Sequence, residues 1–213
     1  TLGSSCVIHS HAYAAVRGMP LRNAAEDFYL LNKLAKVGAV HRARGAGVSI
    51  TSRQSNRVPF GTGPAVGRLL DAKNPCEVPL FYHADCFAVL GQLLQLFRHW
   101  SNEPETDTQA QLIEHLGTAI GTDLERLLTQ WDYQKALRHI HKAGRSDAAR
   151  QQHTHTWFDG FRLLKIIHLL RDHHFPNLTL NEAMRSPEQW PVIHTGTPSG
   201  LRDAIYTHLG WSR

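Results

Sequence analysis

The sequence predicts a mostly helical α/β protein whose strands are confined to its beginning. Strand-like and helix-like patterns alternate over the first eighty residues, whereas apolar residues recur at helical spacing through most of the remainder. Pro75 and Pro79 mark the change of pattern. A chain of 213 residues that is 42% apolar can bury a substantial core. We therefore expect two domains, at residues 1–75 and 76–213.

The first domain should contain both strands and helices. Gly38 is expected to end the longer of its helices, and Gly45 with Gly47 to bend or divide a strand. The elements expected in chain order are a strand at 4–8, helices at 11–16 and 24–37, a strand pair or bent strand at 40–50, an Arg/Gly-rich loop at 52–64 and a helix at 65–72.

The second domain should be a small helical bundle. Phe87, Leu90, Leu94 and Phe97 recur at helical spacing, and a looser stripe runs from Ile113 to Leu127. The most apolar stretch, 157–170, carries polar residues at three-residue steps and is predicted to be the central helix, mostly buried with one polar edge. A Pro/Gly-containing loop at 187–200 and a last helix at 200–209 should follow.

Composition limits the function and the compartment. Lys and Arg number 23 against 18 Asp and Glu, a net charge of +5, which favours weak attraction to phosphates or anionic membranes. Neither a clustered basic helix nor an aromatic platform is expected, and hence no nucleic-acid partner. Three cysteines form no even disulfide framework, which favours a reducing, cytoplasmic location. No apolar run reaches the roughly 20 residues of a transmembrane helix, although the charge is compatible with contact at the inner face of a membrane.

Two adjacent acids, Glu26 and Asp27, open the predicted helix at 24–37. Acids are common in a first helical turn because they complement the helix dipole, and that structural explanation suffices for an isolated pair. Asp27, however, has the same helical phase as Leu30 and Leu34, on the apolar face. A carboxylate facing inward requires donors, a cation or an open cleft, and such surroundings are typical of catalytic sites.

The segments GSSCVIHSHAYAAVRGMP and AAEDFYLLNKLAKVGAV resemble the second half of a family 2 glycosyltransferase of the GT-A fold, over about residues 2–70. The resemblance implies the C-terminal part of a GT-A-like, Rossmann-related domain followed by a helical extension. It further implies an inverting transfer of sugar from a nucleotide-sugar donor to a glycan or other acceptor hydroxyl. Asp27 would be the general base and Glu26 would orient the acceptor.

The Arg/Gly-rich loop is the second candidate site. It ends at a predicted helix N-terminus, where free backbone N–H groups and arginines suit a diphosphate. The alternative is a surface turn with solvated arginines. The donor-binding residues expected from this loop and from the resemblance are Arg53, Arg57, Gly61, Thr62 and Gly63.

The resemblance also implies a divalent cation, Mg²⁺ or Mn²⁺, held by a DxD motif, but this chain contains no DxD. Its nearest approximation, Glu105-Thr106-Asp107, lacks a preceding strand. The nucleotide-binding half therefore either precedes Thr1 in a longer parent protein or does not exist, and we expect the chain alone to be inactive. The histidine-containing segments 83–86, 153–155 and 173–174 lack the spacing of a zinc site and suit capping or solvated histidines better. A non-catalytic helical interaction module is the alternative function.

Overall fold

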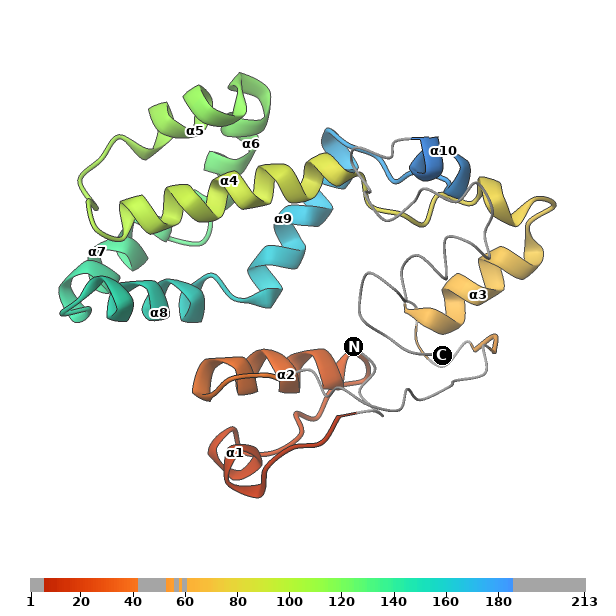
Figure 1. The fold of residues 1–213 in the computed structure, drawn as a ribbon, viewed down its shortest axis with the longest axis horizontal. Coiled ribbons are helices and arrows are strands. Elements are labelled where there is room, and N and C mark those ends of the chain that lie inside the picture. Colours follow the sequence, from red (N-terminus) through yellow and green to blue (C-terminus); the bar gives the residue numbers. More distant parts are fainter. Residues whose placement is uncertain (1–5, 42–52, 56–57, 59–60, 186–213) are drawn as a thin grey trace. The chain divides into compact units, whose positions relative to one another are not determined.

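The computed structural model describes residues 6–41, 53–55, 58 and 61–185. Every regular element in this described part is a helix, so the expectation of a mostly helical protein is confirmed (Figure 1). Residues 6–8 of the predicted first strand have no regular structure. The strands predicted at 40–50 and the helix predicted at 200–209 lie almost wholly outside the described residues. The α/β and Rossmann-related part of the prediction therefore has no strand to support it in the described ranges.

The chain forms two compact units. The first comprises residues 1–81 and 177–213, and the second is the uninterrupted segment Tyr82–Pro176. The predicted boundary near Pro75 to Pro79 lies shortly before the first crossing between the units. The return of the chain to the first unit after Pro176 has no counterpart in the predicted domains at 1–75 and 76–213.

Within the first unit, α1 (Ser10–Ala15) and α2 (Glu26–Val37) pack into a small hairpin (Figure 1). Leu30 and Leu34, 3% and 8% exposed, pack with Val16 at the end of α1. The Lys33 ammonium donates a hydrogen bond to the Val16 carbonyl oxygen at 2.8 Å, which ties the two helices together. Gly38 follows α2, as the sequence predicted.

The described part of the first unit contains three further helices, namely α3 (Thr62–Asp71), the 3₁₀ helix η2 (Pro75–Glu77) and α10 (Leu180–Arg185). Phe81 and Leu178 form an isolated antiparallel bridge, with reciprocal N to O distances of 3.1 and 2.7 Å. Next to it, the fully buried Ala183 packs with Leu180 and Met184. The bridge and this small cluster bring α10 back to the segment that follows η2.

The second unit is a helical domain with a core of its own. Its helices in chain order are α4 (Ala84–Trp100), α5 (Thr108–Leu116), α6 (Thr118–Thr129), α7 (Tyr133–Ala143), α8 (Asp147–Trp157) and α9 (Gly160–His173). The helix α4 packs against α5, α8 and α9, and α5 with α6 forms a tight hairpin (Figure 1). Leu93, Phe97 and Trp100 of α4 are wholly buried. The predicted stripe along α4 is confirmed as the packing face, except that Phe87 is 44% exposed.

The helix predicted over 157–170 is present as α9, but it begins three residues later than predicted. The helix α8 ends at Trp157, and α9 begins at Gly160. The cause is Asp159, whose carboxylate oxygen accepts hydrogen bonds from the backbone N–H groups of Phe161 and Arg162, both at 3.2 Å. An aspartate that caps a new helix start in this way stabilises the break, because it satisfies N–H groups that have no partner within the helix.

One buried polar network joins α5, α6 and α7. The Tyr133 hydroxyl donates to Glu125 at 2.8 Å and is 2.5 Å from the hydroxyl of Thr108. The Tyr133 side chain is almost wholly buried. Burial, followed by the hydrogen bond to Glu125, raises the pKa of Tyr133 to about 12, because both disfavour the phenolate.

Candidate active site

Glu26 and Asp27 are the first two residues of α2, and the sequence predicted them at the start of a helix. Both side chains are partly buried. Asp27 shares its helical face with Leu30 and Leu34, which are buried. Its Oδ1 atom accepts a hydrogen bond from the backbone N–H of Phe28 at 2.8 Å. The carboxylate therefore has a defined local position beside the N-terminal, positive end of the helix dipole.

The turn that leads into α2 is fixed by Tyr13. At the end of α1, the backbone N–H of Gly18 donates to the Tyr13 carbonyl at 2.9 Å, and the N–H of Met19 donates to the Tyr13 hydroxyl at 3.0 Å. Ala25, the residue before Glu26, has a φ of 58°. A non-glycine residue in this left-handed region carries a strain cost on the order of 1 kcal/mol. The acid pair thus follows a constrained turn and a strained residue.

The second candidate group lies at the start of α3. This helix begins at Thr62, so Pro64 is its third residue rather than its first, although it is still in the first turn, where its missing N–H costs no helical hydrogen bond. Gly61, Thr62 and Gly63 form the N-terminal turn. Arg53 is exposed, and Arg57 lies outside the described residues.

A close contact with another backbone segment explains why one residue of this turn is a glycine, so no ligand is needed to account for it. A Cβ atom at Gly63 would lie 2.7 Å from the Ser55 carbonyl oxygen, which is closer than real Cβ contacts. The same loop approaches α3 again, where a Cβ at Gly67 would lie 3.1 Å from the Gln54 amide nitrogen. The described part of the loop therefore packs along the first two turns of α3, and glycines at these positions permit that packing.

The two groups of predicted site residues lie at the N-terminal ends of two different helices, α2 and α3, in the first unit. Each group has the polarity that its expected role requires. Carboxylates stand at the start of α2, and backbone N–H groups without an acid in the first turn stand at the start of α3. Such an uncapped, acid-free helix start suits an anion.

The residues in the described ranges do not fit the divalent cation that the resemblance implies. They contain no group of three or more His, Cys, Asp or Glu side chains able to hold a metal ion. Asp107, the most DxD-like acid, is the N-cap of α5 and accepts a hydrogen bond from the Ala110 N–H at 3.0 Å. The chemistry proposed for this chain is therefore restricted to its own side chains and backbone groups.

The histidine segments have structural roles or are exposed. His83 caps α4 by accepting a hydrogen bond from the Asp85 N–H at 3.2 Å. His174 lies 3.1 Å from the Asp123 carboxylate, while His153 and His155 are exposed on α8. The capping prediction is thus confirmed at His83.

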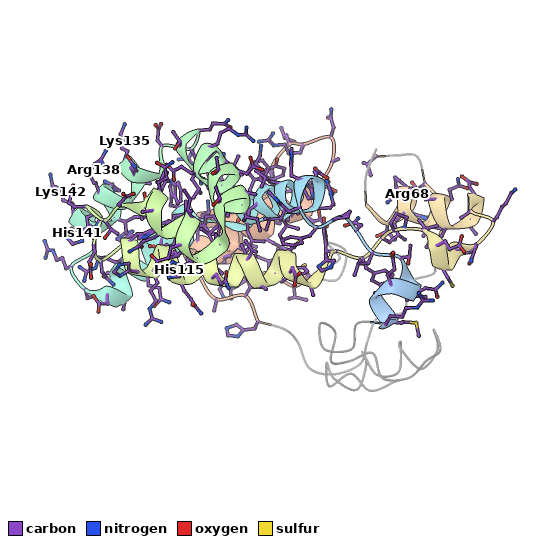
Figure 2. All side chains as sticks on the ribbon, turned by 90° about the horizontal axis from the view of Figure 1, so that it is seen from above. Arg68, His115, Lys135, Arg138, His141 and Lys142 are labelled. Atoms are coloured by element: carbon purple, nitrogen blue, oxygen red, sulfur yellow. The ribbon has the colours of Figure 1, made fainter. Side chains whose placement is uncertain are left out.

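The basic face of helix α7 was not predicted from the sequence. The helix α7 exposes Lys135, Arg138, His139 and Lys142, and it contains no acid. Figure 2 shows the labelled side chains Lys135, Arg138 and Lys142 projecting outward from α7. The expectation that the chain has no clustered basic helix is therefore wrong. The signal was present in the sequence as the spacing i, i+3, i+4, i+7, which the net charge alone does not reveal.

Comparison of the chain with protein-family models, with curated protein sequences and with solved structures gives no match. Of the helices that the structure describes, none is both long and apolar enough to cross a bilayer.

Proposed function

We propose that the chain is the acceptor-side part of an inverting, nucleotide-sugar-dependent glycosyltransferase, with Asp27 as the general base. The observation that carries the proposal is the setting of Asp27. Its carboxylate stands at the start of α2, on the helix face of the buried Leu30 and Leu34, and is positioned by the Phe28 N–H. The resemblance of residues 2–70 to family 2 glycosyltransferases supplies the reaction type.

The proposed chemistry needs one proton acceptor on this chain. An Asp27 carboxylate oxygen takes the proton of the acceptor hydroxyl as the hydroxyl oxygen forms a bond to the anomeric carbon of the sugar. The bond from that carbon to the diphosphate oxygen breaks, and the nucleoside diphosphate leaves with the bonding electrons. Attack opposite the leaving group inverts the anomeric centre. Positioned bases contribute roughly 10²–10⁴-fold to such steps.

The neighbouring residues have supporting roles in this proposal. Glu26 orients the acceptor by accepting hydrogen bonds from its hydroxyls. The turn Gly61–Gly63, with Arg53 and Arg57, contacts the diphosphate through backbone N–H groups and guanidinium groups. The close packing of Gly63 on Ser55 is an independent reason for that glycine. Thr62 and the arginines are consequently better tests of donor binding than the glycines.

The decisive experiment replaces Asp27 by Asn in the full-length protein that contains this chain. We expect sugar transfer from a panel of nucleoside diphosphate sugars to fall by roughly 10²-fold or more, with the far-ultraviolet circular dichroism and donor affinity unchanged, because only the proton acceptor is lost. Asp132→Asn is the matched control. Asp132 is exposed, lies in the second unit, and has a φ of 52°, a conformation that asparagine tolerates. Full turnover by the Asp27→Asn protein would remove Asp27 from the mechanism.

A helical interaction module is the second candidate, and the separate core of the second unit favours it. A module of this kind needs neither Asp27 nor the loop before α3. In that case the Asp27→Asn variant retains every measurable property of the protein, and residues Tyr82–Pro176 alone retain partner binding. Loss of transfer in the Asp27→Asn variant would count against a purely non-catalytic role.

A further inference from the structure

The outward face of α7 carries mainly cationic side chains. At 100° per residue, Lys135, Arg138, His139 and Lys142 fall within an arc of about 100°. The buried residues Tyr133, Leu137 and Ile140 are centred on the opposite side, at 0 to 3% exposure. The apolar face of α7 is thus fully used in packing the second unit, and the basic face has no packing role.

No ion pair in the described part of the fold involves the cations of this face. Among the residues that the structure describes, no acid lies within ion-pair distance of the four basic side chains. The acids of the neighbouring helices are engaged elsewhere, since Glu125 accepts from Tyr133 and Asp147 pairs with Arg150. The face is therefore available to an external anion.

Helix stability does not explain the arrangement. Cations in a last turn favour a helix because they complement the negative end of its dipole, and this accounts for Lys142. Lys135 is the third residue of α7, in the first turn, where a cation opposes the positive end of the dipole. Arg138 follows it three residues later, at a spacing where like charges repel each other. A basic stripe that begins where the helix disfavours it indicates an anionic partner outside the fold.

We propose that the basic face of α7 binds the anionic headgroups of a phospholipid bilayer. The stripe from Lys135 to Lys142 is roughly 10 Å long, and long side chains along it can all reach a flat anionic surface. The face carries no exposed aromatic side chain for stacking on bases. The helix α7 packs against α6 and α8. Its apolar side is buried in the core, so binding is electrostatic adsorption without insertion.

The first test measures co-sedimentation of the full chain with vesicles. We expect binding to vesicles rich in phosphatidylserine, none to pure phosphatidylcholine, and loss of binding in high salt. The combined substitutions Lys135→Gln, Arg138→Gln and Lys142→Gln should weaken binding by roughly 100-fold, because each Lys or Arg near the surface contributes about fivefold. Wild-type binding by this triple variant would overturn the proposal.

The matched control removes the same number of charges elsewhere. Arg68 on α3, Lys73 after it and Arg98 on α4 are exposed and make no ion pair in the described ranges. Their combined replacement by Gln should leave vesicle binding within about twofold of wild type, because the proposal assigns binding to the α7 face, to which none of these three cations belongs. Equal loss in both triple variants would show that net charge, not α7, is responsible, and would overturn the assignment. Binding to duplex DNA by this face in preference to the vesicles would overturn it as well.

Lys135→Glu separates binding from folding. The new carboxylate lies in the first turn of α7 and three residues before Arg138, so the variant should be at least as stable as wild type to heat. It should nevertheless bind anionic vesicles more weakly by roughly tenfold or more, since one cation is lost and one anion is added. A stable Lys135→Glu protein that binds like wild type would contradict the proposal.

Discussion

At the scale of one residue, the buried hydroxyl of Tyr133 stabilises this protein in a way that depends on pH. Its hydroxyl donates to Glu125 and contacts Thr108, so all three polar groups have partners in the buried network. Because burial and Glu125 raise its pKa to about 12, the folded state holds the phenolic proton more tightly than the unfolded chain, whose tyrosines titrate near about 10.

Tyr133→Phe should lower the free energy of unfolding by about 1–2 kcal/mol at neutral pH, because Glu125 and Thr108 lose a partner. The free energy that the bound Tyr133 proton adds to the stability of the folded state is fully present below about pH 10. It is lost as pH rises from about 10 to about 12. The stability difference between wild type and variant should therefore shrink over that range. Urea unfolding of both proteins at several pH values measures it, and a difference that stays constant throughout that range would contradict the assignment.

His168 is the residue for which the pH dependence has the opposite sign. Its Nε2 atom lies 3.1 Å from the Tyr82 hydroxyl, and burial, followed by the Arg171 charge, lowers the pKa of His168 below its usual value. The folded state then binds fewer protons than the unfolded chain in mildly acidic solution, so stability is lost as pH falls below about 6.5. His168→Gln should flatten this acidic decline in thermal unfolding. An unchanged decline would mean that another group causes it.

The helices were the elements most readily predicted, because their apolar spacing and terminating residues are local signals. The predicted helix at 24–37 corresponds to α2, and the one at 11–16 to α1. The break at Asp159 was missed because the apolar pattern continues across it, although Asp159-Gly160 is a turn signal. The basic face of α7 was missed because a net charge carries no information about helical phase.

The hairpin of α5 and α6 depends on one close approach. A Cβ at Gly121 would lie 2.9 Å from the backbone of Leu112 and Ile113, so no side chain fits between the two helices there. Gly121→Ala should destabilise the protein by about 1–3 kcal/mol, because backbone must move to admit the methyl group.

Gly91→Ala is the matched control for that prediction. Gly91 is an exposed residue inside α4, and an added Cβ meets nothing within 4 Å. The same substitution should there stabilise the protein by up to about 1 kcal/mol, since alanine is the better helix former. Chemical denaturation of both variants compares them directly. Equal effects of the two substitutions would show that helix packing at Gly121 is not the determinant.

At the scale of the whole molecule, every described residue in the core of the second unit comes from within Tyr82–Pro176. The segment carries its own buried aromatic cluster of Phe97, Trp100 and Phe158. We expect residues 82–176 expressed alone to unfold cooperatively, with a helical circular dichroism spectrum. A fragment that gave no unfolding transition would mean that the first unit contributes to this core.

The candidate site is less predictable than the helical domain. The position of Asp27 at a helix start follows from local sequence, but its partner groups depend on contacts that one helix cannot specify. The loop before α3 illustrates the difficulty, because Gly63 has a packing reason in Ser55 as well as a proposed ligand. A glycine in the sequence does not distinguish the two.

The bridge between Phe81 and Leu178 has a topological consequence. These residues flank Tyr82–Pro176 on both sides, and their backbones are hydrogen-bonded to each other. The chain therefore leaves the first unit and returns to it at almost the same point, so the second unit has the arrangement of a domain inserted into another domain. Such a segment can be exchanged for a short connector, or transplanted into a surface loop of another protein, with little strain at the junction.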